Sequence, residues 1–230
     1  MVIPNMSITR GAIWDVDGTL VDTAEHHFAA FARFCAEEGR GFTRDEFRWT
    51  FGRRNPEIMV YLFGDACVGA RAEEYADRKE RYYREAAREN LALLPGAGAL
   101  IDGLERAGWV QAIGSSAPRA NLDLIMEVTG LAPRLAAVVS GDDTARGKPH
   151  PDVFLEAARR AGVEPRHCVV LEDAVAGVEA ARAAGMRVIG VTYCAHSPGE
   201  SLVAAGAQRV VANLAELSAG DLAALVDLPG

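Results

Sequence analysis

Two aspartates close to the start of the chain have the residue type and the spacing that phosphoryl transfer requires. Asp15 and Asp17 are two residues apart, directly after the apolar run 12–14, and Gly18 follows them. One carboxylate can attack phosphorus, the second can handle the proton of the leaving group, and together they can help to hold Mg²⁺. Strand side chains alternate, so both carboxylates would face one ligand before Gly18 bends the chain. An Asp-Gly turn after a strand is also a common structural feature, so the pair alone leaves both interpretations open.

A glycine and two hydroxyls, Gly114-Ser115-Ser116, stand between a predicted strand and a predicted helix. The free N–H groups and the positive dipole end of a helix N-terminus suit an anion, and Ser115 can donate a further hydrogen bond to it. A serine at this place can equally be a simple helix cap. The segment therefore indicates either a phosphate site or a cap.

Lys148 and an acid pair, Glu172-Asp173, come after two further predicted strands. The ammonium of Lys148 could neutralise both a phosphate and the attacking carboxylate, although a Lys-Pro pair in a surface loop is the alternative interpretation. Two acids at the end of a buried apolar strand are costly unless a cation or a metal ion accompanies them, and Asp173 could also cap the next helix. The order of these segments, each after a strand, favours one shared site.

The segments that position these groups alternate between helices and short apolar strands. Continuous apolar strands are typical of a sheet covered on both faces, and glycines follow many of the predicted helices, as left-handed caps do. This pattern predicts an α/β fold with a doubly wound, mostly parallel, Rossmann-like sheet, whose ligands bind at the carboxyl ends of the strands. Strands are expected at 8–20, 109–113, 136–139, 168–171, 187–191 and 209–211, and helices at 97–107, 118–129, 151–161, 174–184 and 214–226.

The stretch between the first two strands has a helical pattern instead. Phe28, Phe31 and Phe34 repeat at helical spacing, and Thr43 with Glu46 forms a capping-box pattern before another helix. A longer, charged helix over 70–90 is expected to present a largely solvated face.

This stretch predicts an insertion into the sheet domain. We expect residues 1–22 and 94–230 to form the catalytic core, and residues 23–93 to form a helical cap domain.

Composition limits the classes of protein to consider. The 230 residues are 50% hydrophobic and 24% charged, which suits a folded protein with a sizeable core. A net charge of −8 argues against a nucleic-acid binder, whose surface should be basic. No secretory signal or membrane-length apolar run is visible, and the four scattered cysteines have no zinc or redox spacing. We expect a cytoplasmic monomer that binds neither nucleic acid nor membrane.

Together the four segments resemble the haloacid dehalogenase superfamily of phosphotransferases, in particular its branch with a small helical cap after the first motif, which contains the β-phosphoglucomutases and many sugar-phosphate phosphatases. The resemblance covers nearly the whole chain. It implies that Asp15 becomes a transient aspartyl-phosphate, while Asp17 protonates the leaving oxygen and then activates water or an acceptor hydroxyl. Mg²⁺ would be held by Asp15, the backbone carbonyl of Asp17 and Asp173, with Glu172 close by. Dehalogenation is disfavoured, because a halide needs no proton from Asp17. The other catalytic residues would be Ser115 and Lys148.

The insertion resembles the cap of the mutase branch more loosely. A packed hinge role for His27 and a solvated position for Lys79 are the alternatives to substrate contact. The mutases carry a lysine-asparagine pair after the second motif, where this chain has Pro118-Arg119, and this departure counts against mutase activity. The candidate substrate-binding residues are His27, Arg53, Arg54, Lys79 and Ser116, with both arginines in a loop that starts at Gly52.

We therefore expect a Mg²⁺-dependent phosphatase of small phosphorylated metabolites, such as sugar or polyol phosphates, that works through an aspartyl-phosphate intermediate. A β-phosphoglucomutase that interconverts β-glucose 1-phosphate and glucose 6-phosphate is the close alternative, because it would use the same residues. A non-enzymatic phospho-aspartate signalling module is a distant alternative. In such modules the acid pair precedes the phosphorylated aspartate, whereas here Glu172-Asp173 comes after Asp15.

Overall fold

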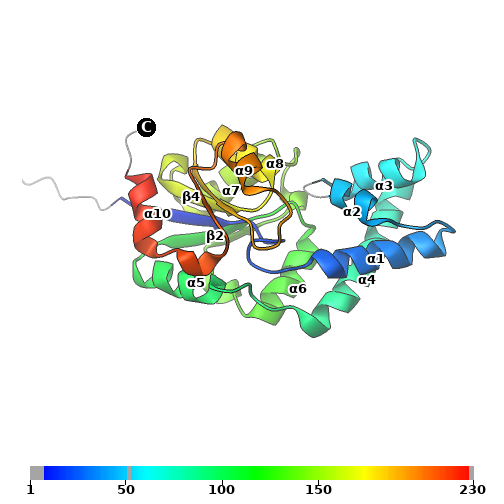
Figure 1. The fold of residues 1–230 in the computed structure, drawn as a ribbon, viewed down its shortest axis with the longest axis horizontal. Coiled ribbons are helices and arrows are strands. Elements are labelled where there is room, and N and C mark those ends of the chain that lie inside the picture. Colours follow the sequence, from blue (N-terminus) through cyan, green and yellow to red (C-terminus); the bar gives the residue numbers. More distant parts are fainter. Residues whose placement is uncertain (1–7, 51–52, 228–230) are drawn as a thin grey trace, which may run out of the picture.

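The computed structural model describes residues 8–50 and 53–227, which form an α/β core with a group of helices beside it (Figure 1). In these residues the sheet has six strands in the order β3-β2-β1-β4-β5-β6, and every neighbouring pair is parallel. The chain thus crosses over in both directions from the central strand β1, as a doubly wound sheet does. The fold class expected from the sequence is confirmed.

The core elements alternate along the chain after four helices that follow β1. The strands are β1 (Gly11–Trp14), β2 (Val110–Gly114), β3 (Ala137–Val139), β4 (Cys168–Glu172), β5 (Arg187–Val191) and β6 (Arg209–Val211). The helices are α1 (Ala24–Glu37), α2 (Arg44–Thr50), α3 (Asn55–Phe63), α4 (Ala70–Asn90), α5 (Ala97–Arg106), α6 (Arg119–Thr129), α7 (Asp152–Ala161), α8 (Val175–Ala183), α9 (Gly199–Ala205) and α10 (Ala219–Val226).

The C-terminal region differs from the prediction in two ways. Helix α9 was not expected, and the helix predicted over 214–226 is shorter, because it begins only at Ala219. Ser218 ends the preceding turn and caps α10: its N–H donates to the Asp221 carboxylate at 2.9 Å, and its hydroxyl accepts the Asp221 N–H at 3.3 Å.

The first strand is also shorter than predicted, since it ends at Trp14.

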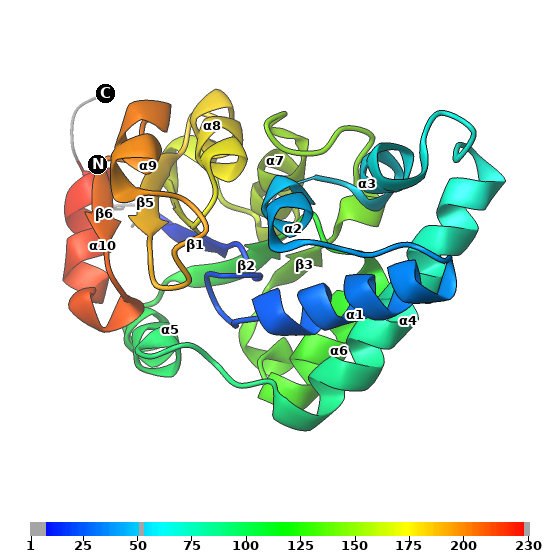
Figure 2. The same cartoon turned by 45° about the vertical axis from the view of Figure 1, so that its right-hand side comes forward.

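The central strand β1 is buried on both faces, and its side chains alternate between two hydrophobic clusters. Ala12 and Trp14 pack into the cluster that α5, α6 and α10 cover. Ile13 packs into the cluster of the opposite face, which α7, α8 and α9 cover. Figure 2 shows these two layers of helices on either side of the sheet. Short apolar strands of this kind are typical of a sheet that is covered on both faces.

Helices α1–α4 build a separate hydrophobic cluster, rich in aromatic side chains. Phe31 and Phe34 of α1 pack against α2, α3 and α4, and α1 runs beside α4 (Figure 2). The predicted capping box is present, because the Thr43 N–H donates to Glu46 at 2.8 Å and the Thr43 hydroxyl accepts the Glu46 N–H at 3.2 Å. The chain enters and leaves this group of helices at one place, where Val21 pairs with Leu93.

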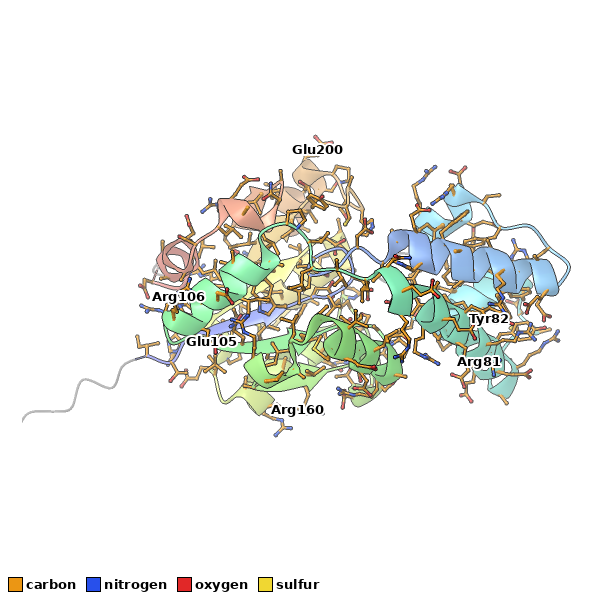
Figure 3. All side chains as sticks on the ribbon, turned by 90° about the horizontal axis from the view of Figure 1, so that it is seen from below. Arg81, Tyr82, Glu105, Arg106, Arg160 and Glu200 are labelled. Atoms are coloured by element: carbon orange, nitrogen blue, oxygen red, sulfur yellow. The ribbon has the colours of Figure 1, made fainter. Side chains whose placement is uncertain are left out.

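The outward faces of the helices are polar. Figure 3 shows labelled side chains that project from the surface of α4, α5, α7 and α9, namely Arg81, Tyr82, Glu105, Arg106, Arg160 and Glu200. In the ranges that the structure describes, no helix combines the length and the apolar character needed to cross a membrane.

Candidate active site

The carboxyl ends of β1, β2 and β4 open into a cavity of about 510 Å³, which helices α1, α3 and α4 cover from the other side. Asp15 lies at the end of β1, and its N–H continues the ladder to the Leu171 carbonyl at 3.0 Å. Every candidate site residue predicted from the sequence lines this cavity: Asp15, Asp17, His27, Arg53, Arg54, Lys79, Ser115, Ser116, Lys148, Glu172 and Asp173. Gly52 lies outside the described residues.

Lys148 lies between two buried carboxylates. Its Nζ is 2.6 Å from Asp15 Oδ1 and 3.2 Å from Glu172 Oε1, and its side chain is only 4% exposed. Burial would lower the pKa of Lys148, but the charges of Asp15 and Glu172 outweigh burial and raise it above the ordinary value. The ammonium therefore keeps its proton and offsets one of the negative charges beside it.

Three carboxylates at this edge form a group that can hold a metal ion. Ligand atoms of Asp15, Glu172 and Asp173 all lie within 4.8 Å of one another, and all three residues are buried. Burial, with the neighbouring carboxylates, raises the pKa of Asp15 to about 7 and that of Glu172 well above its usual value. Lys148 offsets only one of three negative charges, so the ionised site has room for a divalent cation with oxygen ligands.

Two glycines keep this acidic site open. A β-carbon on Gly18 would lie 2.2 Å from Asp173 Oδ2, and one on Gly177 would lie 1.5 Å from Glu172 Oε1. The carboxylates occupy the space that side chains at these positions would fill, so the donor set and its cradle fit a hard cation. The carboxylate of Asp17 is not in the group of clustered ligand atoms found among the described residues, and its predicted ligand is a backbone carbonyl.

Asp17 lies apart from this group, where two polar neighbours hold its carboxylate. The Thr23 hydroxyl donates to Asp17 Oδ1 at 2.5 Å, and His27 Nε2 lies 3.6 Å from the same oxygen. Burial would raise the pKa of Asp17, but the His27 ring and the Thr23 hydroxyl outweigh burial and lower it. The resting carboxylate is therefore ionised.

The ring of His27 is held from two further sides. It stacks on Tyr83 with ring centroids 3.9 Å apart, and its Nδ1 is 2.8 Å from Lys79 Nζ. Because an ammonium can only donate, Nδ1 accepts, and the ring proton lies on Nε2, which faces Asp17. Burial and the Lys79 charge lower the pKa of His27, which keeps the ring neutral.

Lys79 is buried, with 2% of its surface exposed, so the solvated position considered from the sequence was wrong. The reason is that one side of α4 packs against α1 and α6, and Lys79 brings its own counter-ion: its Nζ lies 2.8 Å from Glu80 Oε1. Glu80 also accepts hydrogen bonds from Asn55 at 2.8 Å and from Asn121 of α6 at 2.7 Å. Burial would raise the pKa of Glu80, but the Lys79 ammonium and the Asn121 amide lower it to about 2.

Ser115 and Ser116 lie at the start of the loop between β2 and α6. The Ser115 N–H donates to the Val139 carbonyl at 3.0 Å, and its hydroxyl oxygen accepts the Ala117 N–H at 3.1 Å. This bond lies in the loop, because α6 begins at Arg119 after Pro118 and has no side-chain cap, so the interpretation of Ser115 as a helix cap was wrong. The hydroxyl proton remains available to a ligand in the cavity. Ser116 is half-buried at the cavity wall.

The two arginines of the helical insertion have different surroundings. Arg54 donates to the Thr144 carbonyl and hydroxyl, each at 3.1 Å, and to the Ala145 carbonyl at 3.3 Å, so it ties the helical insertion to the loop that leads to Lys148. Arg53 stays within the insertion, where its guanidinium lies 4.1 Å from the centre of the Trp49 ring.

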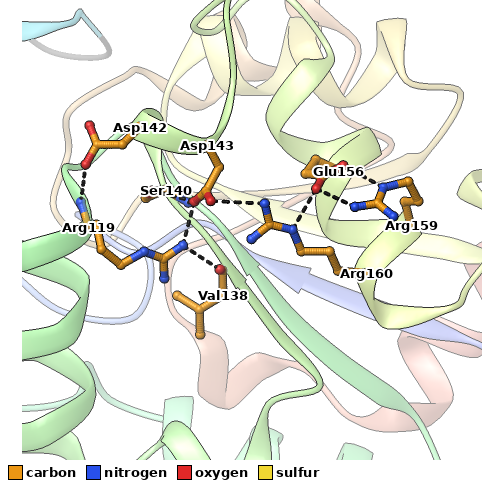
Figure 4. Close-up of polar contacts among 8 residues, drawn as sticks. All are labelled: Arg119, Val138, Ser140, Asp142, Asp143, Glu156, Arg159 and Arg160. Carbon is orange, nitrogen blue, oxygen red and sulfur yellow. Dashed lines mark hydrogen bonds and ion pairs between the residues drawn. The ribbon is translucent and has the colours of Figure 1, made fainter.

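Arg119, which follows the second motif, turns away from the cavity. Its guanidinium donates to the Val138 carbonyl at 2.9 Å and to Asp143 at 2.5 Å, and Arg160 donates to the other oxygen of Asp143 at 3.0 Å (Figure 4). Arg119 is not among the described residues that line the cavity. These contacts brace the loop after β3 and supply no cation to a ligand.

Several site residues were not found from the sequence. Glu80 and Asn121 were overlooked because they lie on helices with no motif, and Asn55 was placed in the arginine loop without a partner. His196, from the loop after β5, places Nδ1 2.6 Å from Asp173 Oδ2. His196 could have been suspected from the sequence only because it lies in a loop that follows the carboxyl end of a predicted strand.

Comparison with known proteins identifies the family of the chain. The family model described as haloacid dehalogenase-like hydrolase matches residues 9–185, and the chain belongs to this family. The β-phosphoglucomutase of Bacillus subtilis is 32% identical over 91% of this chain and 92% of its own length. The phosphorylated carbohydrates phosphatase of Thermotoga maritima is 30% identical over 88% of this chain and 94% of its own. Among solved structures, CbbY from Rhodobacter sphaeroides in complex with phosphate has a TM-score of 0.80 and 28% identity, covering 91% of this chain and 96% of that one.

Proposed function

We propose that the protein is a Mg²⁺-dependent phosphatase of small phosphorylated metabolites, with sugar or polyol phosphates as the substrate class, and that it works through an aspartyl-phosphate on Asp15. The observation that carries the proposal is the arrangement of Asp15, Lys148 and the Glu172-Asp173 pair at one cavity wall, with Asp17 held separately beside them. The separation gives the two aspartates different environments, and so different roles.

In the first step Asp15 forms a bond to phosphorus as the bond to the leaving oxygen breaks, and that oxygen takes a proton from Asp17. The resting Asp17 is ionised, so this proton has to enter with the substrate. A phosphate monoester has a second pKa of about 6, and its monoanion can bring the proton to Asp17. Lys148 and the N–H groups near Ser115 offset the charge on the phosphoryl oxygens.

In the second step Asp17 is a carboxylate again and removes a proton from water. The water oxygen bonds to phosphorus, the bond to Asp15 breaks, and phosphate leaves. The hydrogen bond from Thr23 and the nearby His27 favour this ionised form of Asp17. Mg²⁺, which Asp15, Asp173, Glu172 and the Asp17 backbone carbonyl would hold, would neutralise charge on the transferring group.

Residues 23–93 are proposed to act as a cap domain that closes over the core formed by residues 1–22 and 94–230. Cap closure would exclude bulk water and bring His27, Lys79 and the arginine pair toward the part of the substrate beyond the phosphate. Ser116 would contact the substrate from the core side.

Phosphomutase activity is the second candidate, since one relative carries that name. A mutase must bind the second phosphate of a sugar bisphosphate while that intermediate reorients in the site. The segment after the second motif supplies no cation for this task, because Arg119 bonds to Asp143 and Val138 instead. This observation favours hydrolysis.

The test combines two readouts on one panel of phosphomonoesters with Mg²⁺: free phosphate and isomerised sugar. Release of phosphate that disappears in Asp15→Asn supports the proposal. β-Glucose 1-phosphate with a trace of bisphosphate primer should yield free phosphate; glucose 6-phosphate without phosphate release would establish a mutase. Turnover that survives in Asp15→Asn would refute the aspartyl-phosphate route.

We also propose that the enzyme works as a monomer in the cytoplasm. The four cysteines are unpaired in the structure, which suits a reducing compartment. Both faces of the sheet are already covered by helices of the same chain.

A further inference from the structure

His196 is a side chain at the acidic site, 9% exposed, that the proposed chemistry does not use. It lies in the loop between β5 and α9, lines the cavity, and places Nδ1 2.6 Å from Asp173 Oδ2. At that distance the ring and the carboxylate form a short, charge-assisted hydrogen bond. An ionised carboxylate can only accept hydrogen bonds, so at this distance Nδ1 carries a proton and donates it to Asp173.

The backbone before His196 adopts a conformation that needs support. Ala195 has φ of 53°, and among the described residues it is the one non-glycine residue with positive φ. An alanine in this left-handed region is sterically disfavoured, and such residues gather where a site requires a particular side-chain direction. A hydrogen bond from the Ala195 N–H to the Thr192 carbonyl, at 3.0 Å, closes the turn. The turn aims His196 back over the sheet edge.

The first motif leaves space for this contact. A β-carbon on Gly18 would come within 2.6 Å of His196 Nδ1 and 2.2 Å of Asp173 Oδ2. Gly18 therefore does more than bend the chain, because its lack of a side chain lets the imidazole and the carboxylate meet. Two segments of the chain, the motif at β1 and the loop after β5, are thus shaped around the same pair of atoms.

We propose that His196 is a positioning residue that fixes the rotation of the Asp173 carboxylate and so prepares the divalent-cation site. This inference rests on the metal-dependent function proposed above. A carboxylate has two equivalent oxygens and turns freely unless a partner holds one of them. With Oδ2 held by His196, the Asp173 group keeps its place beside Asp15 and Glu172. Partners of this kind change metal affinity by about 10- to 100-fold in other sites.

The test measures Mg²⁺ binding directly by calorimetry, with no substrate present. His196→Ala should raise the dissociation constant for Mg²⁺ by about tenfold or more. His196→Asn, whose side-chain amide can donate in place of Nδ1, should recover most of the loss. His167→Ala is the matched control, because His167 precedes β4 at the opposite edge of the same sheet and should leave the constant unchanged.

The outcomes separate this inference from the proposed function. Asp173→Asn should abolish Mg²⁺ binding; if it does so while His196→Ala binds within about twofold of the unsubstituted protein, the positioning role is wrong and the function stands. Tighter binding in His196→Ala would also overturn the inference, since His196 would then compete with the metal. If Asp173→Asn and the unsubstituted protein both fail to bind, the metal-dependent function itself fails. Thermal unfolding of each variant shows whether it folds. Should His196→Ala not fold, His196→Leu, which fills the space but cannot donate a hydrogen bond, serves as the deciding variant and should show the same loss of Mg²⁺ affinity.

Discussion

The charges of Asp15, Lys148 and Glu172 have to be considered together. The Lys148 ammonium is the near neighbour of both carboxylates, at 2.6 and 3.2 Å, in a place that water hardly reaches. Removing one partner from a buried set of charges leaves the others uncompensated, which costs more than the pair contributes when intact. The lysine therefore stabilises this set of charges, and under the proposed function it would also offset charge in the transition state.

A Lys148→Met variant should lose activity by about 10²- to 10³-fold in kcat at saturating Mg²⁺, because no fixed positive charge remains beside the transferring group. Steady-state kinetics of phosphate release measure this. Arg166→Met is a suitable control, since Arg166 pairs with Glu164 in an exposed turn. A Lys148→Met enzyme with near-normal kcat would show that the metal ion alone supplies the charge.

The sequence could place a residue in the site when that residue follows a predicted strand. Asp15, Lys148 and Asp173 follow strands or their loops, and parallel strands bring their carboxyl ends to one edge, so their proximity could be inferred. Their catalytic roles stay predictions. Lys79 was misjudged because its neighbour along the chain, Glu80, neutralises it, and a charge that carries its own counter-ion can be buried. His196 has no ligand spacing in the sequence, and only the left-handed turn at Ala195 directs it to Asp173.

At the scale of elements, polar contacts join the helical insertion to the core on two sides of the cavity. On one side Asn121 of α6 donates to Glu80 of α4. On the other side Arg54 bonds to the loop after β3, and a β-carbon on Gly147 would lie 2.7 Å from its Nε. Arg54 thus lies against the residue that precedes Lys148, and its hydrogen bonds link the helical insertion to the loop that leads to Lys148. The sequence indicated a substrate role for Arg54. It could not show that Arg54 contacts the loop after β3, because that contact depends on packing between distant segments.

The Arg54→Ala variant tests this coupling through backbone amide exchange of the loop 144–147. Loss of the guanidinium hydrogen bonds, which are partly exposed to solvent, should lower the free energy of opening of this loop by about 1 kcal/mol. Its backbone amides should then exchange about fivefold faster. Arg53→Ala is the matched control, because within ranges 8–50 and 53–227 the hydrogen bond, ion pair and ring contact of the Arg53 side chain are with Trp49 and Glu57 of its own helical group. Equal exchange in both variants would show that the loop is held by other contacts.

At the scale of the whole molecule, the sheet architecture followed from the apolar strands and the glycine caps, and the comparisons agree with it. The strand order could be anticipated only as doubly wound, because register and order depend on packing between distant segments. The boundaries of the proposed cap, 23 and 93, stay predictions. Glu80 links three helices from both parts of the molecule through Asn55, Lys79 and Asn121, so its ionisation bears on global stability.

The pKa of Glu80 is lowered from 4.5 to about 2, so its carboxylate favours the folded state above its ordinary pKa. This stabilisation, about 3 kcal/mol at most, should be complete above about pH 5 and decline as the pH falls from 4.5 toward 2. Glu80→Gln should be less stable than the unsubstituted protein at pH 6, and the gap should narrow by pH 3. Denaturant unfolding of both proteins at each pH measures this difference in the free energy of unfolding.

Glu85→Gln supplies the comparison for that series, because Glu85 lies on the same helix but pairs with Arg33 at the surface. Its stability should follow that of the unsubstituted protein at every pH. A Glu80→Gln gap that is the same at pH 6 and pH 3 would contradict the assignment of an ionised, stabilising Glu80.

The pairing of Val21 with Leu93, supported by the hydrogen bond from the Leu94 N–H to the Leu20 carbonyl at 2.8 Å, has an evolutionary consequence. Both ends of the inserted segment lie side by side, next to the first motif. A different insert could be spliced in there without altering the path of any strand, and a short turn could replace it altogether. Selection can therefore reshape which molecules are admitted while the phosphorus chemistry is inherited unchanged.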